Sequence, residues 1–292
     1  MKPDLPAVAI IGVGNMGAAI AANLLGQGWP VHVCDRIAAR SQALADVGAS
    51  AYMAPADAAR AAVHVIVCVV DAAQTHDVLF GAGQVADAMR LGHSVMLCPT
   101  MSPDDVESIA LQLRPFGLHC IDAPMSGGPA RARDGSMSLM VACAPTVFER
   151  HRRLIDAMSS QVFRVGERLG DGARTKLVNN LAAGINLVGA AEVLALARQM
   201  GLDLAMTLDV IEHSSGQSWI GSDRMHRALS GDLAPRAHMT LLEKDTRLAM
   251  QCARQLGIEG PMGAAARDAF AQASANGLAE HDDAALLQWM LR

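Results

Sequence analysis

The 292-residue sequence has little of what marks nucleic-acid-binding or metal-binding proteins. It has no long basic run and a formal net charge of −5, which argues against nucleic acid as the main partner. None of its cysteines form a CxxC pair, so we predict no metal site. Five of the six lie in or beside apolar runs, as reduced, buried thiols of a cytosolic protein do. The cysteines are Cys34, Cys68, Cys98, Cys120, Cys143 and Cys252.

Secretion and membrane signals are also missing. Residues 1–6 are polar and proline-bearing, and they lead directly into an apolar run, so no signal peptide is expected. The longest weakly charged stretch, residues 177–197, contains three asparagines and Glu192, which makes it too polar for a good membrane span. We therefore expect a cytoplasmic protein with no membrane partner.

A glycine-rich turn directly follows the first predicted strand, residues 7–11, and precedes a helical pattern. It reads Gly12-Val13-Gly14-Asn15-Met16-Gly17. In a GxGxxG turn the first glycine permits a tight turn, the second lets the backbone approach a pyrophosphate, and the third lets helix and strand pack closely. The helix N-terminus would face the phosphates. The order of strand, turn and helix predicts a dinucleotide site of the Rossmann type.

An acidic residue stands where such a site needs one. Asp35 ends the predicted strand 31–34 and lies 23 residues after Gly12, where a carboxylate would bond the ribose 2′-hydroxyl. A 2′-phosphate would meet a like charge, so NAD is favoured over NADP. Arg36 and Arg40 follow and could hold a phosphate, so NADP stays open.

The distribution of strand and helix patterns predicts two domains. Apolar runs that read as strands end at about residue 166, and helical patterns dominate from residue 170. The expected strands are 7–11, 31–34, 63–70, 94–97, 118–121, 136–142 and 161–165, and the expected later helices are 170–198, 203–213, 220–229, 240–256, 261–275 and 281–291. We predict an α/β domain with a Rossmann-type doubly wound sheet over residues 1–166, followed by an all-helical domain over residues 167–292.

Further candidate residues fall at the carboxyl ends of predicted strands, the edge where open α/β sheets bind ligands. Val70 and Asp71 stand at the end of strand 63–70, and Thr100 follows strand 94–97, so Val70 and Thr100 are candidate cofactor contacts. The alternative is that Ser102-Pro103 only begins a helix there. Ser126-Gly127-Gly128, after strand 118–121, would expose a hydroxyl and free backbone N–H groups to a carboxylate, unless it is only a tight turn.

The stretch 170–197 carries two candidate catalytic side chains. Lys176 and Asn180 are four residues apart and lie on one face of a helix. Buried lysines are scarce, and desolvation lowers a lysine pKa toward the range of acid/base work. The alternative is a buried helix whose lysine reaches solvent. A second lysine, Lys244, precedes Asp245 in a helical pattern, where an exposed charge pair is the alternative.

Four motifs in order resemble those of the β-hydroxyacid dehydrogenases, the group of 3-hydroxyisobutyrate dehydrogenase and tartronate semialdehyde reductase. The resemblance runs through the whole chain, and further stretches are similar to the L-threonate dehydrogenase branch. The motifs are Gly12 to Gly17, Asp122 to Gly128, Gly170 to Asn180 and Lys244 to Ala249; the branch features are 70–74, 78–81, 216–219 and 231–232.

The resemblance implies roles for these residues. Lys176 would be the general acid/base, Asn180 would orient the substrate, and Ser126, Gly127 and Gly128 would hold a substrate carboxylate. Lys244 would close the site and contact both substrate and cofactor. The resemblance also implies a homodimer or homotetramer joined through the helical domains. Independently of the resemblance, the position of Arg36 directly after Asp35 makes it a candidate cofactor contact.

The sequence therefore predicts an NAD(P)-dependent oxidoreductase. It would interconvert a small 3-hydroxy carboxylic acid, such as 3-hydroxyisobutyrate, glycerate or L-threonate, and its oxo acid or semialdehyde by hydride transfer. Imine reductases share the two-domain plan, but their lysine position usually carries another residue. A non-catalytic nicotinamide-binding module need not keep Lys176, Asn180 and the Ser-Gly-Gly together. A decarboxylating sugar-phosphate dehydrogenase is disfavoured by the few basic residues near the motifs.

Overall fold

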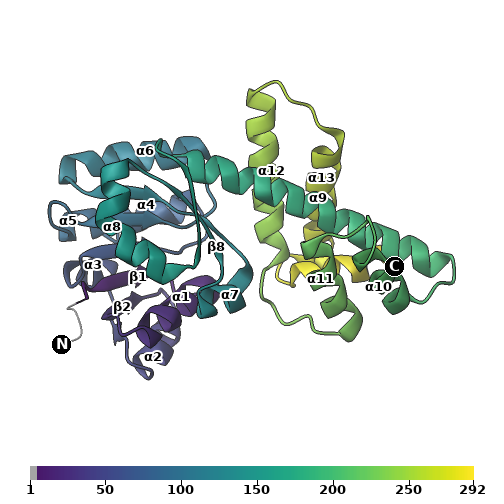
Figure 1. The fold of residues 1–292 in the computed structure, drawn as a ribbon, viewed down its shortest axis with the longest axis horizontal. Coiled ribbons are helices and arrows are strands. Elements are labelled where there is room, and N and C mark those ends of the chain that lie inside the picture. Colours follow the sequence, from purple (N-terminus) through teal and green to yellow (C-terminus); the bar gives the residue numbers. More distant parts are fainter. Residues whose placement is uncertain (1–4) are drawn as a thin grey trace. The chain divides into compact units, whose positions relative to one another are not determined.

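The computed structural model describes residues 5–292, and its contacts divide the chain after Lys176 into two compact units. The first unit is a sheet with helices on both faces, and the second, from Leu177 to Arg292, consists of helices and connecting loops (Figure 1). The predicted fold class, a Rossmann-type α/β domain followed by a helical domain, is confirmed.

The sheet of the first unit has the strand order β3-β2-β1-β4-β5-β6-β8-β7, with β9 paired to β8. Its strands are β1 (Val8–Ile11), β2 (Val31–Cys34), β3 (Ser50–Ala51), β4 (His64–Val67), β5 (Ser94–Leu97), β6 (His119–Asp122), β7 (Met125–Ser126), β8 (Ser138–Ala142) and β9 (Gln161–Gly166). The pairs from β3 to β6 are parallel, whereas β8 runs antiparallel to β6 and β7. The order reverses at β1, between β2 and β4, and open α/β sheets bind ligands at such a point.

Both faces of the sheet are buried. Successive strand residues point to opposite faces, and each face is covered by helices, so one strand contributes to two cores. Val8 and Ile10 of β1 belong to one apolar core, and Ala9 and Ile11 belong to the other. The first core is covered by α1 (Asn15–Gly26), α2 (Ala38–Ala45), α7 (Gly128–Asp134) and α8 (Pro145–Met158). The second is covered by α3 (Pro55–Arg60), α4 (Ala72–Phe80), α5 (Val85–Ala88) and α6 (Pro103–Leu113), with a 3₁₀ turn at Arg114–Phe116. Continuous apolar strands such as β1 are typical of this two-sided burial.

Several predicted bounds were wrong in detail. The strand expected over 63–70 is β4 and ends at Val67, and the residues that follow it, Cys68 and Val69, lie against Gly12 of the glycine turn. Strands β3 and β7 have two residues each, too short for a periodic signal. The strand expected over 136–142 begins at Ser138. Helix α7 lies where the sequence predicted no helix or strand.

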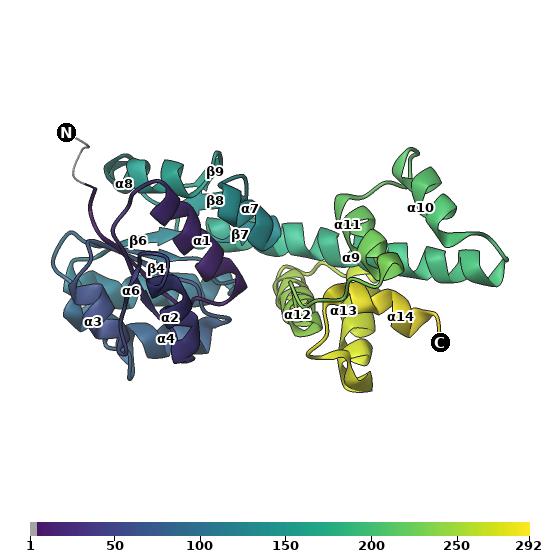
Figure 2. The same cartoon turned by 90° about the horizontal axis from the view of Figure 1, so that it is seen from below.

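The helical unit is organised around α9 (Asp171–Gln199), which begins in the first unit and continues into the second. It is followed by α10 (Leu204–Glu212), α11 (Trp219–Ser230), α12 (Met239–Gln255), α13 (Pro261–Ala273), a π-helical turn (Ser274–Leu278), a 3₁₀ turn (Asp283–Ala285) and α14 (Leu286–Met290). Helices α12 and α13 pack side by side in both views (Figure 2). Leu187, Ala191 and Leu194 of α9 lie in the core of this unit with Phe270.

The last predicted helix, 281–291, was wrong in its first turn. Asp282 is fully buried and accepts hydrogen bonds from the backbone of Arg236 and Ala237, and it pairs with Arg227 at 3.0 Å. These contacts hold the chain in a tight turn, so helix α14 begins only at Leu286. Residues 177–197 were expected to be too polar for a membrane span, but by length and composition alone helix α9 is apolar enough to cross a membrane, a property that core helices of soluble proteins share.

Candidate active site

The glycine turn between β1 and α1 has the geometry that a pyrophosphate site requires. Gly12 has φ +91°, and a Cβ there would lie 2.8 Å from the carbonyl oxygen of Cys68. A Cβ on Gly17 would overlap the carbonyl oxygen of Gly12, so α1 can approach β1 only through a glycine. A Cβ on Gly14, in contrast, would meet no atom within 4 Å. The backbone at Gly14 is thus open to a ligand at the N-terminus of α1, and the residues present fit a dinucleotide phosphate.

Asp35 follows β2 and is tied to the glycine turn. Its carboxylate accepts hydrogen bonds from the backbone N–H of Val13 and of Ile37, each at 2.8 Å, and Arg40 lies 3.7 Å away. Asp35 therefore fixes the loop after β2 against the loop after β1. Each carboxylate oxygen has a second lone pair, so the side chain keeps capacity for a ribose hydroxyl. Arg36 next to it is exposed.

Of the residues after β4 and β5, Asp71 and Ser102 cap helices, whereas Val70 and Thr100 lie at the carboxyl ends of the strands. Asp71 is the N-cap of α4 and accepts from the N–H of Gln74 at 2.8 Å, while Val70 is about half exposed. Ser102 caps α6 in a capping box with Asp105, so the sequence alternative that Ser102 begins a helix is confirmed. Thr100 lies just before this cap, at the carboxyl end of β5.

The Ser126-Gly127-Gly128 segment stands at the end of β7. Ser126 pairs in register with Ser138 of β8, and the next two residues have φ values of +125° and +74°, which favour glycine. A Cβ on Gly128 would meet nothing within 4 Å, whereas one on Gly127 would lie 2.9 Å from Cδ of Arg131. The structure therefore leaves the backbone at Gly128 accessible, as a carboxylate site would need.

The start of helix α9 is held by the buried carboxylate of Asp122. Asp122, the last residue of β6, accepts hydrogen bonds from the N–H of Gly170 at 2.9 Å and of Ala173 at 3.1 Å. Burial raises the pKa of Asp122 to about 6, and these N–H donors oppose the rise because they stabilise the ionised form. Lys176 lies one turn further along α9 and is 7% exposed. Its low exposure does not fit the alternative of a lysine extended into solvent.

Asn180 belongs to a polar network in the helical unit. Its Nδ2 donates to Asp245 on α12 at 2.6 Å, and Nδ2 of Asn179 donates to its Oδ1 at 3.0 Å. Lys244 pairs with the same Asp245 at 3.0 Å, and both side chains are largely buried. The alternative of an exposed charge pair at Lys244 is therefore wrong, because Asp245 points inward to the asparagine. Asn180 and Lys244 are brought together through Asp245.

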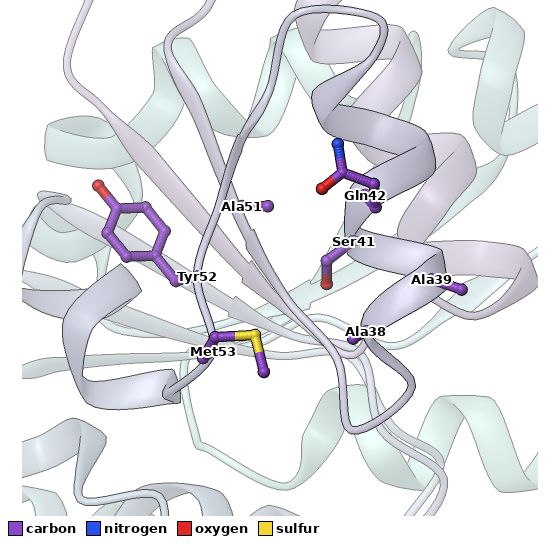
Figure 3. Close-up of a pocket in the computed structure, with 7 residues that line it drawn as sticks. All are labelled: Ala38, Ala39, Ser41, Gln42, Ala51, Tyr52 and Met53. Atoms are coloured by element: carbon purple, nitrogen blue, oxygen red, sulfur yellow. The ribbon is translucent and has the colours of Figure 1, made fainter.

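A surface hollow lies beside the loop after β2, between α2 and the segment that begins with β3 (Figure 3). It is lined by Ala38, Ala39, Ser41, Gln42, Ala51, Tyr52 and Met53, and includes none of the residues that the sequence predicted for the site. Within residues 5–292, no group of three or more His, Cys, Asp or Glu side chains is arranged to hold a metal ion.

Comparisons with known proteins assign the family. The model for the NAD binding domain of 6-phosphogluconate dehydrogenase matches residues 7–166, and the model for NAD-binding of NADP-dependent 3-hydroxyisobutyrate dehydrogenase matches residues 170–290. L-Threonate dehydrogenase from Cupriavidus necator is 35% identical over 281 residues, which cover 96% of this chain and 95% of that protein. The chain belongs to the β-hydroxyacid dehydrogenase family. It is an NAD(P)-dependent 3-hydroxyacid dehydrogenase.

Solved structures agree with this assignment. The crystal structure of 3-hydroxyisobutyrate dehydrogenase from Salmonella typhimurium is 33% identical, with a TM-score of 0.92, and the match covers 98% of this chain and 100% of that one. An imine reductase from Myxococcus stipitatus is 22% identical with a TM-score of 0.69, over 98% of this chain and 100% of that one. The imine reductases share the fold but are more distant from this chain than the hydroxyacid dehydrogenases.

Sequence reasoning missed two carboxylates in this β-hydroxyacid dehydrogenase. Asp122 and Asp245 both stand inside motifs that the sequence singled out, but no role was predicted for either. Each acts on a partner far along the chain, on Gly170 and Ala173 in one case and on Asn180 in the other. Their place in a motif was the available signal; the partner could be identified only from the folded chain.

Proposed function

We propose that this dehydrogenase oxidises a small 3-hydroxy carboxylate at its 3-carbon, with the four-carbon sugar acid L-threonate as the first candidate. Two features support this choice: the stretches that are similar to the L-threonate branch, and the relative from Cupriavidus necator. 3-Hydroxyisobutyrate and glycerate are the next candidates.

The proposed roles follow the chemistry of each side chain. The substrate carboxylate binds at Ser126, Gly127 and Gly128, where a hydroxyl and accessible backbone lie together. Lys176 takes the proton of the 3-hydroxyl in oxidation and returns it in reduction, and Asn180 orients the same hydroxyl or the carboxylate. The nicotinamide, when bound, accepts or supplies the hydride. Lys244 contacts substrate and cofactor from the helical part of the chain.

The observation that carries the proposal is the burial of the two polar groups on one face of α9. Lys176 is 7% exposed and Asn180 8%, and they stand one turn apart on α9. Buried lysines are scarce, and a buried asparagine needs hydrogen-bond partners, which Asn180 has in Asp245. General acid/base catalysis by a positioned group contributes about 10²- to 10⁴-fold to a rate.

We infer NAD as the preferred cofactor. Asp35 places a carboxylate beside the glycine turn, where it suits a ribose 2′-hydroxyl and opposes a 2′-phosphate. Val70 and Thr100 at the sheet edge, and Arg36 beside Asp35, complete the proposed contacts. Residues 1–166 would form the cofactor domain, and 167–292 the substrate and dimerisation domain.

We also propose a cytoplasmic homodimer or homotetramer joined through the helical domain. Val193 and Leu196 are exposed three residues apart on one face of α9, and Met200 is exposed directly after the helix ends. Met206 and Val210 are exposed on one face of α10. Grouped apolar side chains at helical spacing favour a second copy as the covering surface.

The test is a spectrophotometric assay at the NADH band with the purified protein. L-Threonate, 3-hydroxyisobutyrate, D-glycerate, L-serine and 3-hydroxypropionate would each be offered with NAD and with NADP. The proposal expects a rate with one acid and a higher kcat/KM with NAD. Silence with every acid, while NADH still binds, would contradict the substrate class. A higher kcat/KM with NADP would contradict only the role given to Asp35, and the substrate class would stand.

A further inference from the structure

The carboxylate of Asp122 joins two parts of the first unit that carry different reaction roles. Asp122 closes β6 in the middle of the sheet, in register with Leu97 of β5 and Ala142 of β8, and is 1% exposed. Four residues later the chain reaches Ser126, in the carboxylate-binding segment. The same carboxylate accepts hydrogen bonds from the N–H groups of Gly170 and Ala173 at the start of α9. Helix α9 carries Lys176 about one turn further along.

The backbone N–H groups at the start of α9 bind this carboxylate. The N–H groups that begin a helix lack partners inside it, and the helix dipole favours a negative charge there. A capping acceptor usually comes from the adjoining residue, but here it comes from a strand about 50 residues earlier in the chain. A Cβ on Gly172 would lie 2.8 Å from the carboxylate atoms, so a glycine is needed for this approach.

A second contact holds the same turn from its outer side. Arg174 donates to Glu107 of α6 at 2.7 Å and to Asp171 at 2.9 Å, and Arg168 donates to the same Glu107. Arg174 and Glu107 are each about one-third exposed, so water screens this pair. Because the Asp122 contact is buried and the Glu107 contact is partly exposed, Glu107 offers a matched control.

We propose that Asp122 is a positioning residue for Lys176. Its carboxylate fixes the first turn of α9 against the end of β6, and thereby sets the place of the Lys176 amine relative to the Ser126-Gly127-Gly128 segment. This inference rests on the proposed function, in which the amine exchanges a proton with a substrate held by that segment. A misplacement of about 1 Å in such a pair costs about 10²-fold in rate.

Asp122→Asn tests the proposal in the full-length protein. The amide keeps the side-chain volume, removes the charge, and turns an NH₂ group or a single oxygen toward the N–H donors. We expect kcat to fall about 10- to 100-fold, while KM for NAD and the NADH dissociation constant stay within about twofold of wild type. Glu107→Gln should leave kcat within about threefold, because an exposed ion pair contributes little.

A second readout follows Lys176 without turnover. The sequence has three lysines, Lys2, Lys176 and Lys244, so reductive methylation with ¹³C-formaldehyde gives few NMR signals, assigned by single Lys→Arg variants. Asp122→Asn should shift the Lys176 signal and leave that of Lys244 in place. Glu107→Gln should shift it less. If Asp122→Asn does not fold, Gly172→Ala presses on the same contact from the helix side and is read in the same two ways.

The outcomes separate the two ideas. A fall in kcat with a shifted Lys176 signal supports the positioning role. An unchanged kcat, or a fall in kcat with an unmoved Lys176 signal, would overturn it while the proposed function stands. If wild type turns over no acid, the proposed function fails, and the NMR comparison alone decides whether Asp122 places Lys176.

Discussion

At the scale of single residues, the glycines of the first turn do two separable things. Gly17 is required by packing, because its Cβ would overlap the carbonyl oxygen of Gly12. Gly14 is not, because a Cβ there meets open space. If the second glycine serves the ligand and the third serves the fold, the two positions should respond differently to the same added methyl group.

The prediction is therefore a matched pair. Gly17→Ala should destabilise the protein by about 2 kcal/mol or more, since backbone atoms must move. Gly14→Ala should change stability by less than about 0.5 kcal/mol and weaken NADH binding at least tenfold. Urea unfolding and NADH fluorescence titration measure the two effects. A Gly14→Ala protein with wild-type NADH affinity would contradict the pyrophosphate assignment.

At the scale of elements, the sequence was most informative where a signal is local. Strand β1 and the glycine turn were predictable because an apolar run and glycines stand together, and Ser102-Pro103 indicated the start of α6. Strands β3 and β7 were not predictable, because two residues carry no periodicity. The contacts of Asp122 and Asp245 join distant segments, so no local pattern could reveal them.

A histidine cluster at the amino ends of the central strands could not be predicted from local sequence patterns either. His64, Ser94 and His119 are the first residues of β4, β5 and β6 and stand in register. Nδ1 of His64 lies 2.8 Å from Oγ of Ser94, and Nδ1 of His119 lies 2.9 Å from Nε2 of His151 on α8. Burial lowers the pKa of His64 and of His151 to about 4, and neighbouring His93, Arg90 and Arg150 add to the positive surroundings.

The cluster predicts a loss of stability in acid. Since the two rings titrate near pH 6.5 when unfolded and near pH 4 when folded, the unfolded chain binds more protons between these values. Stability should be flat in this respect above pH 6.5 and fall as pH drops toward 4, by up to about 1.4 kcal/mol per pH unit for each ring. Asp122, whose pKa is raised, acts in the opposite direction, so the comparison must be with a variant.

The variant is His151→Gln, which keeps a polar side chain but cannot be protonated. Urea unfolding at pH 7 and pH 5 should show a smaller loss for the variant than for wild type. His281→Gln is the control, because that exposed ring lies in the helical unit and does not belong to the cluster. Equal losses in wild type and His151→Gln would contradict the account of the cluster.

At the scale of the whole molecule, the helical unit leaves an apolar surface to be covered. Leu196 of α9 is 58% exposed and lies between Val193 of the same helix and Met200, which directly follows it. If the proposed oligomer forms through this surface, Leu196→Glu should give a smaller species than wild type in light scattering after gel filtration, because a charge buried at an interface is costly. Leu256→Glu, at a more exposed leucine of the same unit that lies outside α9 and α10, should leave the mass unchanged.

The central claim is that Lys176 is the acid/base of a 3-hydroxyacid dehydrogenase. The measurement that tests it most directly is the kcat of Lys176→Ala on the acid that wild type oxidises, with NADH affinity measured on the same sample. We expect a loss of about 10²- to 10⁴-fold in kcat, with the NADH dissociation constant within about twofold of wild type. Turnover within tenfold of wild type would contradict the assignment of Lys176.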